Sequence, residues 1–199
     1  MDVLTLSRPV LRTAAALCVT LMGLTVADGL WSQINVQNGP TPDESIEYRV
    51  KAAYLLNFTR YVEWPTSVGE DNRLSICVMG TDPFGRILDA TVAGRTVQGR
   101  PLEVRRIQTA SDANGCEVVF VSRDTWRRNP GSLKTLVNAG SLTVGESEQF
   151  ARGGGVIGFV ILDQTVRFVV NDDARDRAGL RISSRMLSLA AAIYGRGRS

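Results

Sequence analysis

The hydrophobic pattern of the chain predicts one long amphipathic helix, followed by short apolar strands that alternate with further helices. The first helix spans residues 41–63, where apolar side chains recur at the three- and four-residue spacing of one helical face. These side chains are Val50, Tyr54, Phe58, Tyr61 and Val62. Such a stripe usually covers a hydrophobic core, because burial of the apolar face is what stabilises a surface helix.

Both ends of this helix carry local signals. Thr41 is a suitable N-cap, Pro42 fits the first helical position, and Glu44 is placed to complete a capping box. Pro65 cannot continue a helix and pushes Trp64 toward an extended backbone. We therefore expect Trp64 to turn back into the core and to lie buried against the sheet.

The middle of the chain predicts a sheet covered by helices. Gly94 and Gly99 mark a hairpin there. The strands are expected at residues 74–79, 102–107, 116–121 and 141–144, and the helices at residues 82–91 and 130–139. The order strand, helix, strand, strand, helix, strand favours a mostly parallel sheet joined by right-handed crossovers.

The pattern then changes to two strands joined by a tight turn. Residues 156–162 and 166–170 flank the turn at residues 163–165, so these two strands must be antiparallel. A short helix is expected from Asp172, and a last helix from Ser183 or Ser184 through Ile193. The predicted fold class is α/β, a Rossmann-like three-layer sandwich whose mostly parallel sheet gains an antiparallel hairpin near the C-terminus.

This hairpin is the predicted partner surface. In its second strand, Val166, Phe168 and Val170 should point inward, whereas Arg167 and Val169 share the other face, so that Val169 lies near solvent. The first strand is apolar on both faces and includes Ile157 and Phe159. A strand of this kind needs either a second layer or a partner to cover it. The candidate contacts are Ile157, Phe159, Arg167 and Val169, and coverage by the last helix is the alternative.

The N-terminus has the pattern of an export signal. Arg8 and Arg12 flank the start of an apolar run, residues 13–26, and small residues near Ala27 suit cleavage. An uncleaved anchor is the alternative. The predicted organisation is a signal peptide at 1–27, a flexible leader at 28–40, one domain at 41–194 and a frayed tail at 195–199. Removing residues 1–27 lowers the net charge from +3 to +2, a balance that gives no argument for a nucleic-acid partner.

The residue types exclude most catalytic chemistry. The chain has no histidine, which removes the commonest general base and metal ligand. Two separated cysteines cannot form a zinc site alone, so we expect no metal, no cofactor and no enzymatic activity. Gly80, Thr81, Asp82 and Phe84 follow a buried strand and open a helix, where α/β sheets bind ligands. They form a candidate ligand pocket, with an ordinary helix start as the alternative.

Without Cys18, which lies in the predicted signal, the chain keeps an even pair, Cys77 and Cys116. An even cysteine count in an exported protein suggests a disulfide. The alternative is a pair of buried free thiols.

A series of short motifs resembles the YfiR family. The opening signature is Lys51-Ala-Ala-Tyr54, Asn57-Phe58 and Val62-Glu-Trp-Pro65. The later landmarks are residues 76–85, 99–102, 116, 142–144, 150–151, 153–154, 167–168, 178–180 and 182–187. They occur in the family's order, and the resemblance runs from about Val50 to Ala191.

The resemblance implies a periplasmic regulator that represses a membrane-bound diguanylate cyclase by contacting its periplasmic part, and that an outer-membrane lipoprotein sequesters in turn. A homodimer is expected. Cys77 and Cys116 match the family's main cysteine pair, whereas Ala151 and Gly158 occupy the region of a second pair. The alternatives are a small-ligand-binding or sensor accessory protein, and an enzyme that uses carboxylates only.

Overall fold

The computed structural model describes residues 42–65 and 72–195, with side chains from residue 45 onward. These residues belong to one compact unit, residues 39–199. The predicted signal peptide and leader lie outside the described residues. The same holds for the predicted cap Thr41, for the side chain of Glu44 and for residues 196–199 of the tail.

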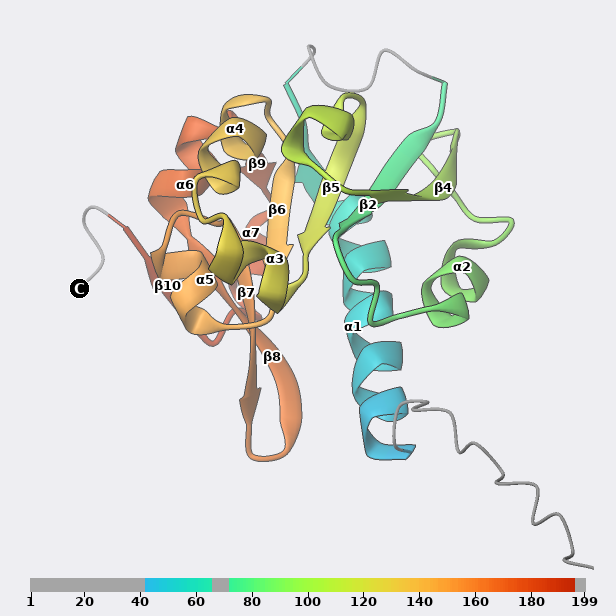
Figure 1. Ribbon diagram of the computed structural model, residues 1–199, viewed down its shortest axis with the longest axis horizontal. Coiled ribbons are helices and arrows are strands. Elements are labelled where there is room, and N and C mark those ends of the chain that lie inside the picture. Colours follow the sequence, from blue (N-terminus) through green and yellow to red (C-terminus); the bar gives the residue numbers. More distant parts are fainter. Residues whose placement is uncertain (1–41, 66–71, 196–199) are drawn as a thin grey trace, which may run out of the picture. The chain divides into compact units, whose positions relative to one another are not determined.

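The centre of the fold is a mixed sheet of eight strands in the order β10-β8-β7-β6-β5-β2-β4-β3 (Figure 1). Its strands are β2 (Leu74–Met79), β3 (Thr96–Val97), β4 (Arg100–Ile107), β5 (Cys116–Val121), β6 (Leu142–Gly145), β7 (Ile157–Leu162), β8 (Thr165–Asn171) and β10 (Ala192–Tyr194). From β4 through β2, β5 and β6 to β7 every pairing is parallel. The β7–β8 and β3–β4 pairs are antiparallel. The predicted α/β class with a mostly parallel sheet is confirmed.

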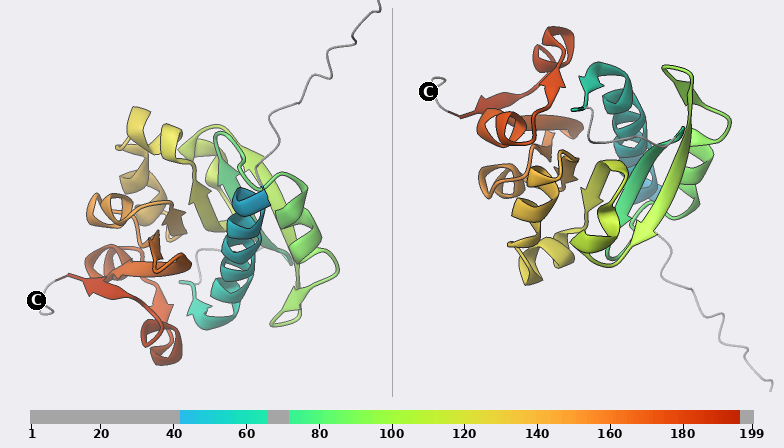
Figure 2. Two further views of the ribbon diagram at one scale, coloured as in Figure 1. Left: turned by 90° about the horizontal axis from the view of Figure 1, so that it is seen from below. Right: turned by 90° about the horizontal axis from the view of Figure 1, so that it is seen from above.

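Helices cover both faces of this sheet (Figures 1 and 2). They are α1 (Pro42–Tyr61), α2 (Arg86–Val92), α3 (Arg123–Arg128), α4 (Ser132–Asn138), α5 (Glu148–Arg152), α6 (Asp172–Arg177) and α7 (Ser184–Leu187), with a 3-10 turn, η1 (Ala110–Ala113). Alternate residues of one strand serve two separate cores. Ile76 packs in the core that includes α1 and α2, whereas Met79 packs in the core that includes α4 and α5. These two cores give the three layers.

The end of α1 differs from the prediction. The helix stops at Tyr61, because Val62 and Glu63 form strand β1 (Val62–Glu63), which pairs with β9 (Arg181–Ile182). Trp64 is half-buried rather than buried. Its indole Nε1–H donates to the carbonyl oxygen of Glu117 at 2.7 Å, so Trp64 contacts the sheet through its polar edge.

Two other helices begin or end differently. The helix predicted from Asp82 starts only at Arg86, because the Asp82 carboxylate accepts the backbone N–H groups of Phe84 and Gly85 and holds a turn there. The last helix, α7, ends at Leu187, and the chain continues as β10, which pairs parallel to β8. The prediction of a helix through Ile193 is therefore wrong. Pairing with the edge of β8 stabilises a strand at residues 192–194 more than the helical spacing of the apolar residues stabilises a helix there.

The predicted disulfide is confirmed. Cys77 in β2 and Cys116 in β5 are bonded, with their Cα atoms 5.9 Å apart. Both side chains are fully buried in the core that includes α4 and α5. The bond joins two neighbouring parallel strands, and it closes the long connection between them into a covalent loop.

A buried carboxylate lies beside this bond. Glu117 is fully buried, accepts the backbone N–H of Ser75 at 2.8 Å and forms an ion pair with Arg100. It therefore links β5 to β2 and to the start of β4. Removing one member of such a pair lowers the free energy of unfolding strongly, because the other member is left in a position that water reaches poorly.

We expect the double substitution Cys77→Ala and Cys116→Ala to lower the free energy of unfolding by about 2–4 kcal/mol, since it frees the loop between the two cysteines in the unfolded chain. Urea unfolding of the purified protein measures this change. The same loss should follow reduction of the unsubstituted protein. Two titratable thiols per chain before reduction would contradict the bond.

Glu117→Ala should cost about 3–5 kcal/mol, because it removes both the ion-pair partner of Arg100 and the acceptor of the buried Ser75 N–H. Glu148→Ala is the matched control, since the Glu148–Arg152 pair lies at the surface and should change the urea midpoint little. Equal effects of the two substitutions would show that the buried ion pair does not stabilise the fold.

Candidate functional site

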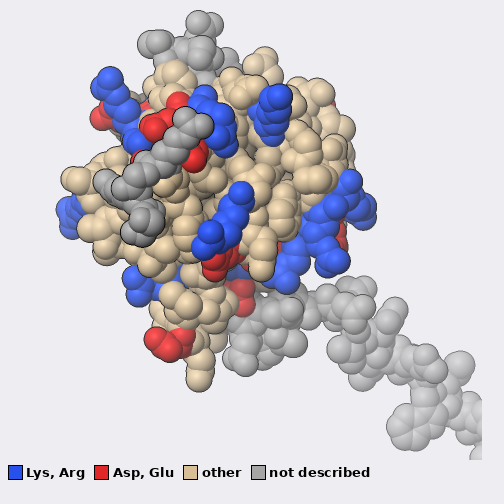
Figure 3. All heavy atoms as spheres, turned by 90° about the vertical axis from the view of Figure 1, so that its left-hand side faces the viewer, with Lys and Arg blue, Asp and Glu red and all other residues tan. Residues whose placement is uncertain are grey.

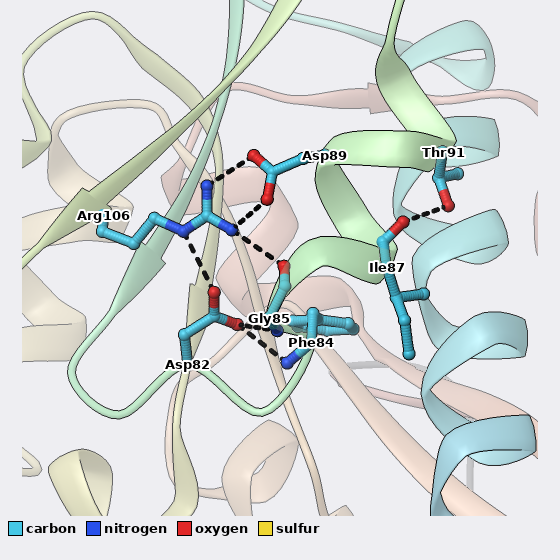
Figure 4. Close-up of polar contacts among 7 residues, drawn as sticks. All are labelled: Asp82, Phe84, Gly85, Ile87, Asp89, Thr91 and Arg106. Atoms are coloured by element: carbon cyan, nitrogen blue, oxygen red, sulfur yellow. Dashed lines mark hydrogen bonds and ion pairs between the residues drawn. The ribbon is translucent and has the colours of Figure 1, made fainter. Parts of the chain in front are cut away.

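The predicted ligand loop lies at the carboxyl end of β2 and is held by Arg106 of β4 (Figure 4). The guanidinium donates to Asp82 at 3.0 Å, to both oxygens of Asp89 at 2.6 Å and to the carbonyl oxygen of Gly85 at 3.0 Å. The hydrogen bond from Arg106 is the largest influence on the Asp89 carboxyl and lowers its pKa. The same bond raises the pKa of Arg106. The Arg106 guanidinium and the backbone N–H groups of Phe84 and Gly85 are therefore engaged within the fold.

The space beside this loop is also filled. Strands β4 and β5 lie on opposite sides of β2, which is the topological switch where α/β sheets usually bind ligands. Gly80 has φ +88°, and a Cβ there would lie 1.9 Å from Oγ1 of Thr125 and 2.8 Å from Oγ of Ser122. The start of α3 therefore closes the crevice.

The other two residues of the predicted pocket lie apart from each other. Phe84 is buried and packs edge-on against Tyr48 and Phe120, whereas Thr81 is exposed. Ligand binding at Gly80, Thr81, Asp82 and Phe84 stays a prediction, and the cavities described below are formed by other residues.

A groove of about 530 Å³ lies beyond the carboxyl end of β6. Its walls include Glu47 and Lys51 from α1, Glu146 and Ser147 after β6, and residues 159–162 of β7. Arg123, at the start of α3, also lines it and donates to the carbonyl oxygen of Glu146 at 3.3 Å. The groove thus brings together α1, the end of β6 and the hairpin.

Two ion pairs of Lys51 lie in the wall of this groove. Lys51 is only 3% exposed, and its Nζ lies 2.8 Å from Glu146 and 2.5 Å from Glu47. The hydroxyl of Tyr48 donates to the same Glu146 oxygen at 3.0 Å. Sequence reasoning assigned no role to Lys51 or Glu146, because they are 95 residues apart and only the fold brings them together.

The predicted partner residues of the hairpin are mostly inaccessible. Ile157, Phe159 and Val169 are buried, and half-buried Arg167 donates to the carbonyl oxygen of Leu189 at 3.3 Å. The prediction that Val169 lies near solvent is wrong, since it is 3% exposed. The unpredicted strand β10 pairs with β8 at Val169 and covers this part of the hairpin. The inward positions Val166, Phe168 and Val170 are buried as predicted.

The accessible apolar residues of the hairpin lie at its turn. Ile161 is 52% exposed and Leu162 is 47% exposed. Ile161 lines a second cavity, of about 480 Å³, together with Ile46 and Val50 of α1, which are also exposed. We call Ile46, Val50 and Ile161 the tip patch. A signal for it was present in the sequence, because Ile161 and Leu162 directly precede a tight turn at Asp163.

The described residues show neither a metal centre nor a membrane span. Within residues 42–65 and 72–195, no three His, Cys, Asp or Glu side chains are placed to hold a metal ion together. No helix in the same ranges has the length and apolar content needed to cross a membrane. On the face shown in Figure 3, the basic side chains lie in separate groups, with acidic side chains beside several of them.

One solved structure has a similar α/β fold. A conserved domain protein from Vibrio cholerae O1 biovar eltor superimposes with a TM-score of 0.50 and 13% identity, over 77% of this chain and 60% of the other. An ABC domain from Streptococcus pneumonia, solved in complex with L-Trp, gives a TM-score of 0.45 and 12% identity, over 64% of this chain and 57% of the other. The chain thus spans less than two thirds of either structure. A search of curated proteins found no match.

A comparison with protein families places most of the described chain in one of them. Residues 48–191 match the family described as YfiR/HmsC-like. This region contains the Lys51–Glu146 pair, the disulfide and the whole β7–β8 hairpin. The chain belongs to the YfiR/HmsC-like family.

Proposed function

We propose that this protein is a periplasmic repressor that holds down cyclic-di-GMP synthesis by contacting the periplasmic part of an inner-membrane diguanylate cyclase. Family membership supports this role in general terms, because YfiR-like proteins are periplasmic regulators of diguanylate cyclase signalling. The structure of this chain adds a candidate surface for that contact.

The observation that carries the proposal is the tip patch. Ile46, Val50 and Ile161 are large apolar side chains left in water, whereas most others in the described chain are buried. Covering apolar surface contributes about 25 cal/mol per Å², so these side chains favour a protein contact. Their backbones belong to α1 and to a hairpin anchored in the sheet, which makes the patch a preformed docking surface.

The remaining features of the proposed function concern the whole protein. The proposal includes export by a cleaved signal at residues 1–27, a leader at 28–40 and one regulatory domain at 41–194. It also includes a homodimer and sequestration by an outer-membrane lipoprotein. The single disulfide suits an oxidising compartment, and its burial favours a structural role over redox control.

The double substitution Ile46→Glu and Val50→Glu should abolish repression while leaving thermal stability nearly unchanged, because both side chains are exposed. Cellular cyclic-di-GMP should then rise to the level of a strain that lacks the protein. Leu189→Glu is the control, since Leu189 is as exposed as Ile46 but does not line the tip-patch cavity.

The control variant should repress normally. Normal repression by the doubly substituted protein would exclude the tip patch as the contact. A rise in cyclic-di-GMP caused equally by Leu189→Glu would show that any charge on the exposed apolar surface disturbs the protein.

A further inference from the structure

Strand β7 has a neighbour along its whole length on one side only. It pairs with β8 from Ile157 to Leu162. On the other side it pairs with β6 at Ile157 and Gly158 alone, because β6 ends at Gly145. In Figure 1 the turn end of the hairpin extends past the end of the sheet. Residues 159–162 therefore form a strand edge with no adjacent strand among the described residues.

Two hydrogen bonds establish which backbone groups point out of this edge. The carbonyl oxygen of Val166 accepts from the Tyr54 hydroxyl at 3.3 Å, and that of Phe168 accepts from the backbone N–H of Ala191 at 2.7 Å. Both carbonyls thus point away from β7. Directly opposite residues of an antiparallel pair share this orientation, and Ile161 lies opposite Val166. The N–H and C=O of Ile161 consequently point away from β8, toward the side of β7 on which β6 lies before it ends at Gly145.

The groove beyond β6 borders this edge. Successive side chains of a strand lie on opposite faces, and the groove is lined by Phe159 and Ile161 from one face and by Val160 and Leu162 from the other. A cavity that touches both faces of one strand must pass around the strand's edge. The opposite wall is formed by Glu146 and Ser147, where β6 would continue.

The opposite edge of the hairpin is protected. Tyr54 and Ala191 occupy the outward carbonyls of β8, and β10 pairs with its last residues. Natural sheets usually protect an open edge with a charge, a proline or a bulge. The edge of β7 has Ile161 and Leu162 instead, both exposed. An unprotected apolar edge of this kind is suited to pairing with another strand.

We infer that β7 binds an extended segment of a protein partner by strand addition. The segment would lie beside β7 beyond Glu146 and Ser147, pair with the outward backbone groups of Phe159 and Ile161 and place apolar side chains alternately on both faces. Near Glu146 the Lys51 ammonium is already shared between Glu47 and Glu146, so the segment needs no acidic side chain to pair with Lys51. This inference rests on the proposed function insofar as the segment belongs to the periplasmic part of the cyclase.

The open edge makes a prediction about the free protein. The amide proton of Ile161 should exchange with solvent much faster than those of Val160 and Leu162, whose N–H groups face β8. Hydrogen–deuterium exchange followed by NMR measures all three. Adding the purified periplasmic part of the cyclase should protect the Ile161 amide. Protection of this amide in the free protein, or no added protection in the complex, would overturn the inference.

A pair of substitutions at one position separates the backbone from the side chain. Ile161→Pro removes the outward N–H, at an edge where proline is tolerated, and should weaken binding by roughly tenfold or more. Ile161→Ala keeps the N–H and removes only part of the tip patch, so it should weaken binding by a few-fold. Equal losses would assign the contact to side chains alone and reject strand addition. Thermal unfolding checks that both variants fold.

A second probe keeps this inference distinct from the proposed function. If the wild-type protein does not bind the periplasmic part of the cyclase, the proposed function fails, and a phage-displayed peptide library then tests the edge by itself. Selected peptides should protect the Ile161 amide and lose binding to Ile161→Pro but not to Ile161→Ala. Peptides that bind without protecting any amide of residues 159–162 would reject the strand-addition site.

Discussion

A parallel strand in the centre of a sheet must be covered on both faces, and the fold depends on this requirement at β2 and β5. All residues of both strands are buried. Their alternate side chains supply two cores, one with α1 and α2 and one with α4 and α5. Every polar group at this level therefore needs a partner inside the protein. Glu117 has Ser75 and Arg100 as partners, and the two cysteines are bonded to each other.

The same constraint explains how much of the fold the sequence predicts. Short apolar runs bounded by glycine or polar residues identified β2 and β5 with their observed bounds, because six residues suit a buried strand and are too few for a typical buried helix. Prediction failed where a pairing partner decided the structure. Val62 and Glu63 continue a helical pattern but pair with β9, and Ile193 continues another but pairs with β8. Local spacing contains no information about a distant strand edge.

The candidate site was predictable in kind but not in position. The sequence identified the hairpin and its doubly apolar first strand, yet Val169 and Phe159 proved to be buried and Ile161 exposed. The difference arises from strand lengths. Where β6 ends relative to β7 decides which residues have a neighbour, and β10 decides which part of β8 is covered. Both depend on the assembled sheet, as does the approach of Lys51 to Glu146.

The crevice where α/β folds usually bind ligands and the open edge of β7 differ in whether their polar groups have partners within the protein. At the switch between β2 and β5, Thr125 and Ser122 fill the space above Gly80, and Arg106 engages both nearby carboxylates. The polar groups there are satisfied within the protein, so a ligand would have to replace good hydrogen bonds with equivalent ones. At the end of β7 the outward groups of Phe159 and Ile161 belong to the backbone, and the strand itself ends in the exposed apolar side chains of Ile161 and Leu162. Displacing water from exposed apolar side chains favours binding. This contrast is the reason that we propose the hairpin, and not the crevice, as the binding surface.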